Sequence, residues 1–129
     1  MPNELKIAAL VVALVLAGCK TEPILNVNQT AVTNAAGNPL TREQVRGAIV
    51  RAGGALGWQM ADEGPDRLVG TIQLRKHAAV IEIPYSKAGY TVKYRSSMNL
   101  DEKDGKIHSN YNGWIQNLHR GINAQLSAS

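Results

Sequence analysis

Apolar residues recur with a helical period in two segments of the chain. The first segment opens at Thr41, which has capping-box spacing to Gln44, and Gly57 is the expected stop. The apolar stripe between them consists of Val45, Ala48, Ile49, Ala52 and Leu56. The second segment runs roughly from 109 to 126, and its stripe consists of Tyr111, Trp114, Ile115, Leu118, Ile122 and Leu126. We predict a helix in each segment.

Between these helices the pattern changes to a period of two, which is typical of strands with one buried face. Residues 67–75 alternate, with Leu68, Ile72 and Leu74 opposite Thr71, Gln73 and Arg75. In 79–85 the apolar set has the other parity, so a turn or bulge is expected near 76–78. Residues 89–96 alternate again, with Tyr90, Val92 and Tyr94 opposite Thr91, Lys93 and Arg95. A further short strand is expected at 58–61.

This order of elements predicts an α+β fold. The expected arrangement is a helix, an antiparallel meander of three to four strands, and a second helix. Both helices should cover one face of the sheet, while the opposite face meets water. Tyr111 and Trp114 lie on the apolar stripe, so we expect them to pack against the sheet rather than form a binding platform.

The amino terminus has the pattern of a secreted precursor. Ile7 to Ala17 is an unbroken apolar run, shorter than the roughly 20 residues that cross a bilayer as a helix. The next residues complete the stretch Leu16-Ala17-Gly18-Cys19, which resembles the bacterial lipobox. That resemblance implies cleavage between Gly18 and Cys19, a diacylglyceryl group on the Cys19 sulfur, and acylation of the new amine. Cys19 is the one cysteine of the sequence, so no intramolecular disulfide is expected.

The domain organisation follows from these patterns. We expect a lipoprotein signal peptide at 1–18, a lipidated N-terminus and flexible tether at 19–39, and a single α+β domain at 40–129. The tether is predicted because Lys20 to Pro39 lacks periodicity and is rich in Asn, Thr, Ala and Pro. Ile24, Leu25 and Val27 are an exception, as a short edge strand or as a patch packed back on the domain. In proteobacterial lipoproteins, an Asp directly after the lipidated cysteine favours retention in the inner membrane. This chain has Lys20 at that position, so the resemblance favours the periplasmic face of the outer membrane.

The formal net charge of +4 is spread along the chain rather than gathered in a basic run. Nucleic acid is therefore not an expected partner, whereas an envelope protein or an acidic envelope polymer is. Arg75, Lys93 and Arg95 on the polar face of the sheet are candidates for an interaction face. The alternative is that they are the ordinary charges of a sheet face in water.

No pattern in the chain predicts catalysis. His77, His108 and His119 lack helical metal-ligand spacing, and no second cysteine accompanies Cys19, so no metal is expected. The sequence holds no Gly-x-Ser-x-Gly elbow and no phosphate-binding Gly-rich loop. The acidic stretch 101–105 lacks the ligand spacing of a calcium loop and is predicted to be a turn. No cofactor is expected beyond the covalent lipid.

The segment Ile107-His108-x-x-Tyr111-Asn112-x-Trp114, with Gly57-Trp58 and Tyr90, Tyr94 and Ser97, resembles a group of small uncharacterised proteobacterial lipoproteins. The resemblance implies a single lipid-anchored domain and carries no activity. The predicted function is therefore a non-catalytic binding or adaptor module of the cell envelope, and not an enzyme. The alternative is a carrier or sensor for a small molecule or lipid.

Overall fold

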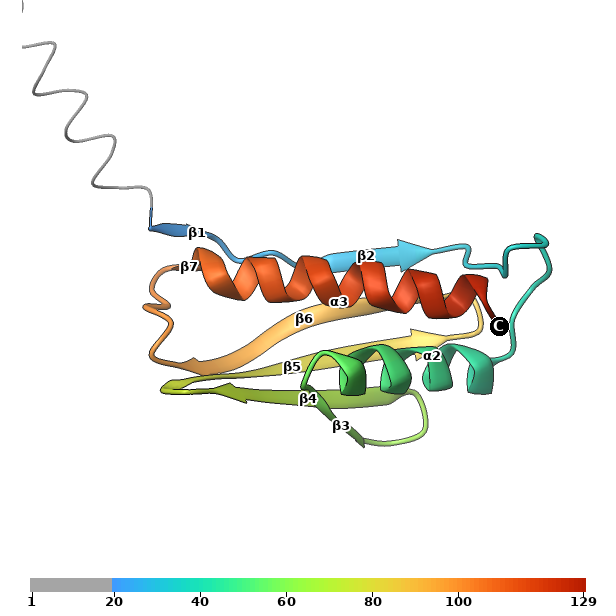
Figure 1. Cartoon of the computed structure of the whole chain (residues 1–129), viewed down its shortest axis with the longest axis horizontal. Coiled ribbons are helices and arrows are strands. Elements are labelled where there is room, and N and C mark those ends of the chain that lie inside the picture. The colour runs from blue at the N-terminus through green and yellow to red at the C-terminus, as the bar shows by residue number, and fades with distance from the viewer. Residues whose placement is uncertain (1–19) are drawn as a thin grey trace, which may run out of the picture.

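The computed structural model describes residues 20–129. Five antiparallel strands form one sheet in the order β2-β6-β5-β4-β3, and β1 pairs with β7 as a separate antiparallel ribbon. Two helices complete the fold (Figure 1). The elements in chain order are β1 (Thr21–Pro23), β2 (Val27–Thr30), α2 (Arg42–Ala55), β3 (Gln59–Asp62), β4 (Arg67–Leu74), β5 (His77–Ser86), β6 (Gly89–Met98), β7 (Lys106–His108) and α3 (Ser109–Ser127).

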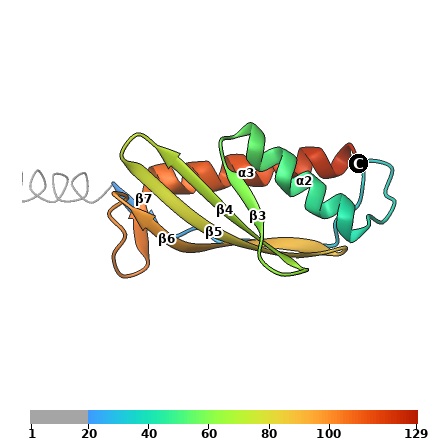
Figure 2. The ribbon, with the colours of Figure 1, turned by 90° about the horizontal axis from the view of Figure 1, so that it is seen from below.

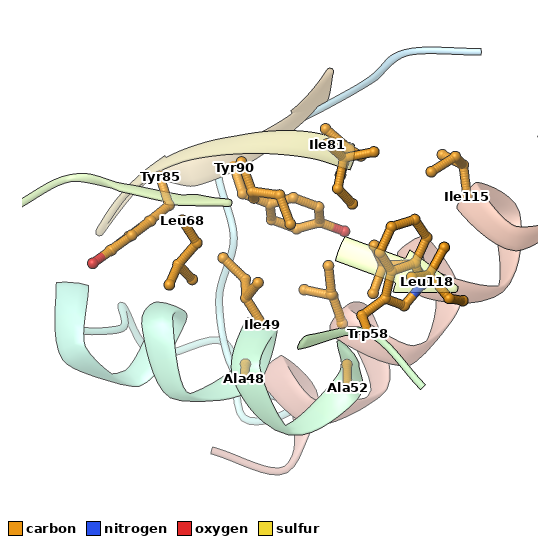
Figure 3. Packing of buried hydrophobic residues seen from close by; sticks show 14 of the residues in the cluster. Ala48, Ile49, Ala52, Trp58, Leu68, Ile81, Tyr85, Tyr90, Ile115 and Leu118 are labelled. Atoms are coloured by element: carbon orange, nitrogen blue, oxygen red, sulfur yellow. The ribbon is translucent and has the colours of Figure 1, made fainter. Parts of the chain in front are cut away.

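The structure has two layers, with α2 and α3 on the same face of the sheet (Figure 2). The core lies between the layers, where Ile49 of α2 and Leu118 of α3 face Leu68, Ile81 and Tyr90 of the strands (Figure 3). The predicted α+β class is therefore confirmed. The sheet has five strands instead of three to four, and two strands precede the first helix. Within residues 20–129, neither helix combines the length and hydropathy that a membrane span requires.

The start of α2 is the one that the capping box predicts. The Thr41 hydroxyl accepts from the Gln44 backbone N–H at 3.1 Å, and the Gln44 side chain accepts from the Thr41 N–H at 2.9 Å. The helix ends at Ala55, and Gly57 follows with a φ of 91°. Because Leu56 lies beyond the last helical residue, it leaves the predicted stripe and is 40 % exposed.

The predicted change of parity between β4 and β5 is a tight turn. Leu74 pairs with His77, so Arg75 and Lys76 are the two residues of the connection. Arg75 has a φ of 56°, the left-handed conformation that such turns require at their first central position. The expectation that Arg75 lies on the polar face of a strand is therefore wrong.

A β-bulge interrupts the pairing of β5 with β6. Ile81 pairs with Tyr94 and Val80 with Ser96, which leaves Arg95 as the extra residue of β6. The bulge moves Tyr94 and Ser97 to the same face of the sheet, and their hydroxyl oxygens lie 2.8 Å apart. A bulge also bends its strand, so the second half of β6 departs from the direction of the first.

Residues 21–39, predicted to belong to a tether, are part of the folded domain. β2 pairs with β6 from Val27 opposite Val92 to Thr30 opposite Gly89, which makes it an edge strand of the sheet. Val27 lies on this edge strand, and Ile24, Leu25 and Val27 pack against the core, so both predicted alternatives for these residues hold in part. The tether prediction is wrong because a short edge strand is held mainly by backbone hydrogen bonds to its neighbour. A polar composition does not prevent these bonds. The predicted signal peptide 1–18 and Cys19 lie outside the described residues.

Candidate functional site

A groove opens where the amino-terminal segment separates from β6. The segment pairs with β6 only as far as Val92, and its first strand then pairs with β7. β6 continues to Met98 and is bent by the bulge at Arg95. The resulting cavity has a volume of about 730 Å³. We call it the β6 groove; its polar lining comprises Asn26, Asn28, Thr91 and Lys93, and its apolar lining comprises Ile24, Val27 and Tyr94.

Two asparagine amides in the β6 groove are bonded to β6, and the backbone partner of Asn26 fixes the orientation of its amide. The Oδ1 atom of Asn26 accepts from the backbone N–H of Tyr94 at 3.2 Å. A backbone N–H can only donate, so the amide oxygen must face it and the NH₂ group must face away. The Oδ1 atom of Asn28 accepts from the Thr91 hydroxyl, also at 3.2 Å. Both amide oxygens therefore accept a hydrogen bond within the protein, and no hydrogen bond from either NH₂ group to residues 20–129 is present.

Lys93 adds a positive charge to these donors. It lies on the outward face of β6 between Thr91 and the bulge, and it is exposed. Among residues 20–129, no carboxylate lies within salt-bridge distance of its ammonium, and no carboxylate lines the groove. The groove is therefore rich in hydrogen-bond donors and carries one cation.

The apolar lining of the groove is held by contacts to the rest of the domain. The Tyr94 ring packs edge-on against Tyr111 of α3, with ring centroids 5.6 Å apart and an interplanar angle of 84°. The backbone N–H of Ile24 donates to the Gly105 carbonyl at 2.9 Å, which ties the segment to the loop before β7. The groove is thus built on fixed elements rather than on a free loop.

Asn112 fastens the amino-terminal wall of the groove to α3. This side chain is 7 % exposed, and its Oδ1 atom accepts from the Leu25 N–H at 3.0 Å. Its Nδ2 atom donates to the Pro23 carbonyl at 2.9 Å and to the Glu22 carboxylate at 3.2 Å. This role of Asn112 was not predicted from the sequence. The available signal is an amide one position after Tyr111 on the apolar stripe of α3.

The three predicted interaction residues do not form one cationic face. Arg95 donates to Glu63 at 2.6 and 3.0 Å and to Glu82 at 3.0 Å. Arg67 lies 3.5 Å from each of the same two carboxylates, which completes a network of two cations and two anions. The hydrogen bond from Arg95 lowers the pKa of both Glu63 and Glu82. Arg95 is therefore neutralised and Arg75 lies in a turn, so Lys93 alone of the three lines the groove.

Each histidine has a hydrogen bond that fits a structural role. The Nδ1 atom of His77 lies 2.8 Å from the Asn99 carbonyl oxygen, and that of His108 accepts from the Asn110 N–H at the start of α3. The Nδ1 atom of His119 lies 2.8 Å from the Tyr90 hydroxyl, which also donates to Asn123 at 3.0 Å. Residues 20–129 hold no group of three or more metal-ligating His, Cys, Asp or Glu side chains.

The remaining predicted features lie as follows. Tyr111 is fully buried and Trp114 packs partly buried against the core, as expected from the stripe of α3. The acidic stretch 101–105 ends in a tight turn in which Lys103 and Lys106 exchange backbone hydrogen bonds of 2.9 and 3.0 Å. This confirms the predicted turn. It also places Asp101 and Asp104 beside Thr21 at the β1–β7 end of the molecule.

Comparison with known proteins finds no match to a family model, to a curated protein or to a solved structure. The function must therefore be inferred from the β6 groove and from the amino-terminal sequence. The groove can bind an acceptor-rich ligand along a mixed polar and apolar surface. Its lining offers amides, a hydroxyl and an ammonium, and neither a carboxylate nor an imidazole.

Proposed function

We propose that this chain is a lipid-anchored protein of the bacterial cell envelope whose domain is a non-catalytic binding module. The observation that carries the proposal is the β6 groove, in which Asn26, Asn28 and Lys93 present donors on walls fixed by hydrogen bonds. A preorganised set of polar groups around a concave surface is the usual form of a binding site.

The anchor in this proposal is Cys19, acylated after cleavage of the lipobox, on the periplasmic face of the outer membrane. Two or three acyl chains hold a protein on a bilayer without any further contact. β1 begins at Thr21, two residues after the anchor, and two residues span at most about 7 Å. The β1–β7 end, which lies opposite the C-terminus in Figure 1, would therefore rest against the membrane surface.

The chemistry of the groove supports binding over catalysis. General acid–base catalysis needs a group that exchanges protons near neutral pH, most often an imidazole or a carboxylate. The groove lining offers Lys93 as its one ionisable cation, together with Tyr94, whose hydroxyl is engaged with Ser97. The groove is open to solvent, whereas a small-molecule carrier buries most of the surface of its cargo, so the shape favours a binding surface over a carrier.

Crosslinking in living cells tests the binding site. A photoreactive amino acid at position 28 in the groove should capture an envelope component under irradiation. The same residue at position 73, on the outward face of β4, is the matched control and should capture little. Equal capture from both positions, or capture from position 73 alone, would show that the groove is not the binding site.

The anchor is tested separately by mass spectrometry of the amino-terminal peptide. The mature protein should begin at residue 19 and carry the mass of a diacylglyceryl group and an acyl chain. Cys19→Ser should remove the lipid and shift the protein from the membrane fraction to the soluble fraction. An unmodified cysteine in the wild-type protein would contradict the anchor.

A further inference from the structure

We infer that the β6 groove recognises the carboxylate groups of an acidic glycan. The inference rests on the proposed function and names its ligand class. Its basis is the set of hydrogen-bond donors that the groove presents. The amide oxygens of Asn26 and Asn28 accept hydrogen bonds from Tyr94 and Thr91, so their NH₂ groups are the atoms offered to a ligand. Lys93 offers an ammonium, which has donors and no acceptor.

A carboxylate is the complement of this set. An ionised carboxylate only accepts hydrogen bonds, and bonds between charged partners are about twice as strong as neutral ones. No acidic side chain lines the groove itself, and Glu82, which lies opposite Lys93 on β5, is bonded to Arg95. A ligand rich in donors would instead leave the two NH₂ groups and Lys93 without partners, which is costly once water is displaced.

The groove suits a glycan better than a peptide. Peptides that dock beside a strand add to its open edge through backbone hydrogen bonds. Here the first open N–H of β6 beyond β2, that of Tyr94, is already bonded to the Asn26 side chain. Recognition therefore falls to side chains. Their polar rim and the apolar surface of Ile24, Val27 and Tyr94 match a sugar ring, which has hydroxyls at its edge and C–H groups on its faces.

The charges at the β1–β7 end argue against a bilayer as the acidic partner. This end carries Lys20, Lys103 and Lys106 together with Glu22, Asp101, Glu102 and Asp104. Carboxylates therefore outnumber ammonium groups where the anchor would hold the domain against the membrane. Basic residues are attracted to an anionic membrane surface, and the acidic residues here offset that attraction. Lys93 belongs to β6 rather than to the β1–β7 ribbon, and its side chain is exposed.

Titration of the full lipidated chain in a neutral detergent tests the inference, with oligogalacturonate as the carboxylated glycan. The wild-type protein should bind it, and the fully methyl-esterified glycan should bind at least roughly 10-fold more weakly. Lys93→Gln should lose a similar factor. Lys87→Gln removes the same charge from the exposed β5–β6 turn and should bind like the wild type. Polyglutamate and glycerol phosphate, added as competitors, should displace the glycan poorly.

Four results would overturn the inference. They are absence of oligogalacturonate binding, equal affinity for the methyl ester, equal loss in the Lys87 variant, and displacement by polyglutamate or glycerol phosphate at matched concentrations. The last result would identify a peptide or a lipid headgroup as the ligand. If capture from position 28 in cells persists while the glycan does not bind, the binding module stands and the glycan assignment alone fails.

Discussion

The side-chain oxygen of Asn112 accepts a hydrogen bond of 3.0 Å from the backbone N–H of Leu25, 87 positions earlier in the chain. This contact joins the start of α3 to the segment between β1 and β2. The same amide donates to the Pro23 carbonyl at 2.9 Å. The Asn112 side chain thus bonds backbone groups that a neighbouring strand would otherwise bond. The wall of the β6 groove is therefore positioned by an element on the helical layer.

Replacing Asn112 with alanine should destabilise the domain and loosen that wall. The change leaves the Leu25 N–H and the Pro23 carbonyl without their partner, which costs roughly 1–3 kcal/mol of unfolding free energy. Denaturant unfolding measures the loss, and amide hydrogen exchange at Leu25 should accelerate in the same variant. Asn110→Ala alters an exposed asparagine of the same helical turn and should change neither quantity. Unchanged exchange at Leu25 in the Asn112 variant would rule out this role.

The Arg95 network should make stability depend on acid. Hydrogen bonding to Arg95 lowers the pKa of Glu63 and Glu82 below the ordinary value of 4.5. A carboxyl with a lowered folded pKa stabilises the fold above its unfolded pKa, and that contribution is lost as pH falls through the folded pKa. Arg95→Gln should therefore lower the thermal midpoint at neutral pH and flatten its decline below about pH 4.5.

The control for this network is Arg42→Gln. Arg42 lies 3.8 Å from Glu43 in an exposed pair outside the network, so its removal should leave the acid profile unchanged. Thermal midpoints measured from neutral to acid pH compare the three proteins. Parallel profiles for wild type and the Arg95 variant would show that the network contributes nothing to the acid response.

The buried Tyr90 hydroxyl should affect stability at both neutral and alkaline pH. Tyr90→Phe removes the hydrogen bonds to His119 and Asn123 and should cost about 1–2 kcal/mol at neutral pH. Burial raises the pKa of Tyr90 above the ordinary 10.0. The folded state therefore keeps its proton while the unfolded state loses it, so stability falls as pH rises above about 10.

Tyr94→Phe is the matched control for this prediction, because its hydroxyl bonds only to Ser97 and is less buried. It should lose less stability at neutral pH than Tyr90→Phe. Above about pH 10 the difference in unfolding free energy between the wild type and Tyr90→Phe should become smaller. The wild type then loses the stability that its neutral phenol contributes. A constant difference across that range, measured by denaturant unfolding, would contradict the raised pKa of Tyr90.

Arg75 adopts a conformation that suits other residues better. Its φ of 56° is costly for most side chains, whereas asparagine tolerates it. Arg75→Asn should therefore raise the unfolding free energy by up to about 1 kcal/mol. Lys76→Asn changes the neighbouring turn residue, whose φ is not positive, and should bring no comparable gain. Denaturant midpoints that rise equally for both variants would assign the effect to charge rather than to backbone conformation.

Local sequence signals predicted the parts of the fold that depend on neighbouring residues. The capping box at Thr41 and Gln44 fixed the start of α2 because both partners lie within one turn. The alternation of Tyr90, Val92 and Tyr94 likewise marked the buried face of β6. Periodicity over five or more residues reports burial directly, so these elements followed from the sequence.

Features that depend on distant partners did not follow from the sequence. β2 has only four residues, too few to show a period, and its place beside β6 is set by pairing across 59 to 65 positions. Arg95 was predicted to be a cation of the interaction face. In the structure it lies in a bulge and its charge is neutralised by hydrogen bonds to Glu63. Lys93 kept its predicted outward face, but the groove beside it requires the amino-terminal segment to be folded.

The central proposal is that the β6 groove is the binding site of this protein. Nuclear magnetic resonance of the isotope-labelled full chain in a neutral detergent tests it most directly, with solubilised cell-envelope polymer as the titrant. The backbone amide signals of Asn26, Asn28, Thr91 and Lys93, and the side-chain amide signals of the two asparagines, should shift in a saturable manner. The backbone amide signals of the outward face around Thr71 and Gln73 should not. Shifts confined to that face, or an absence of shifts in the groove at saturation, would contradict the claim.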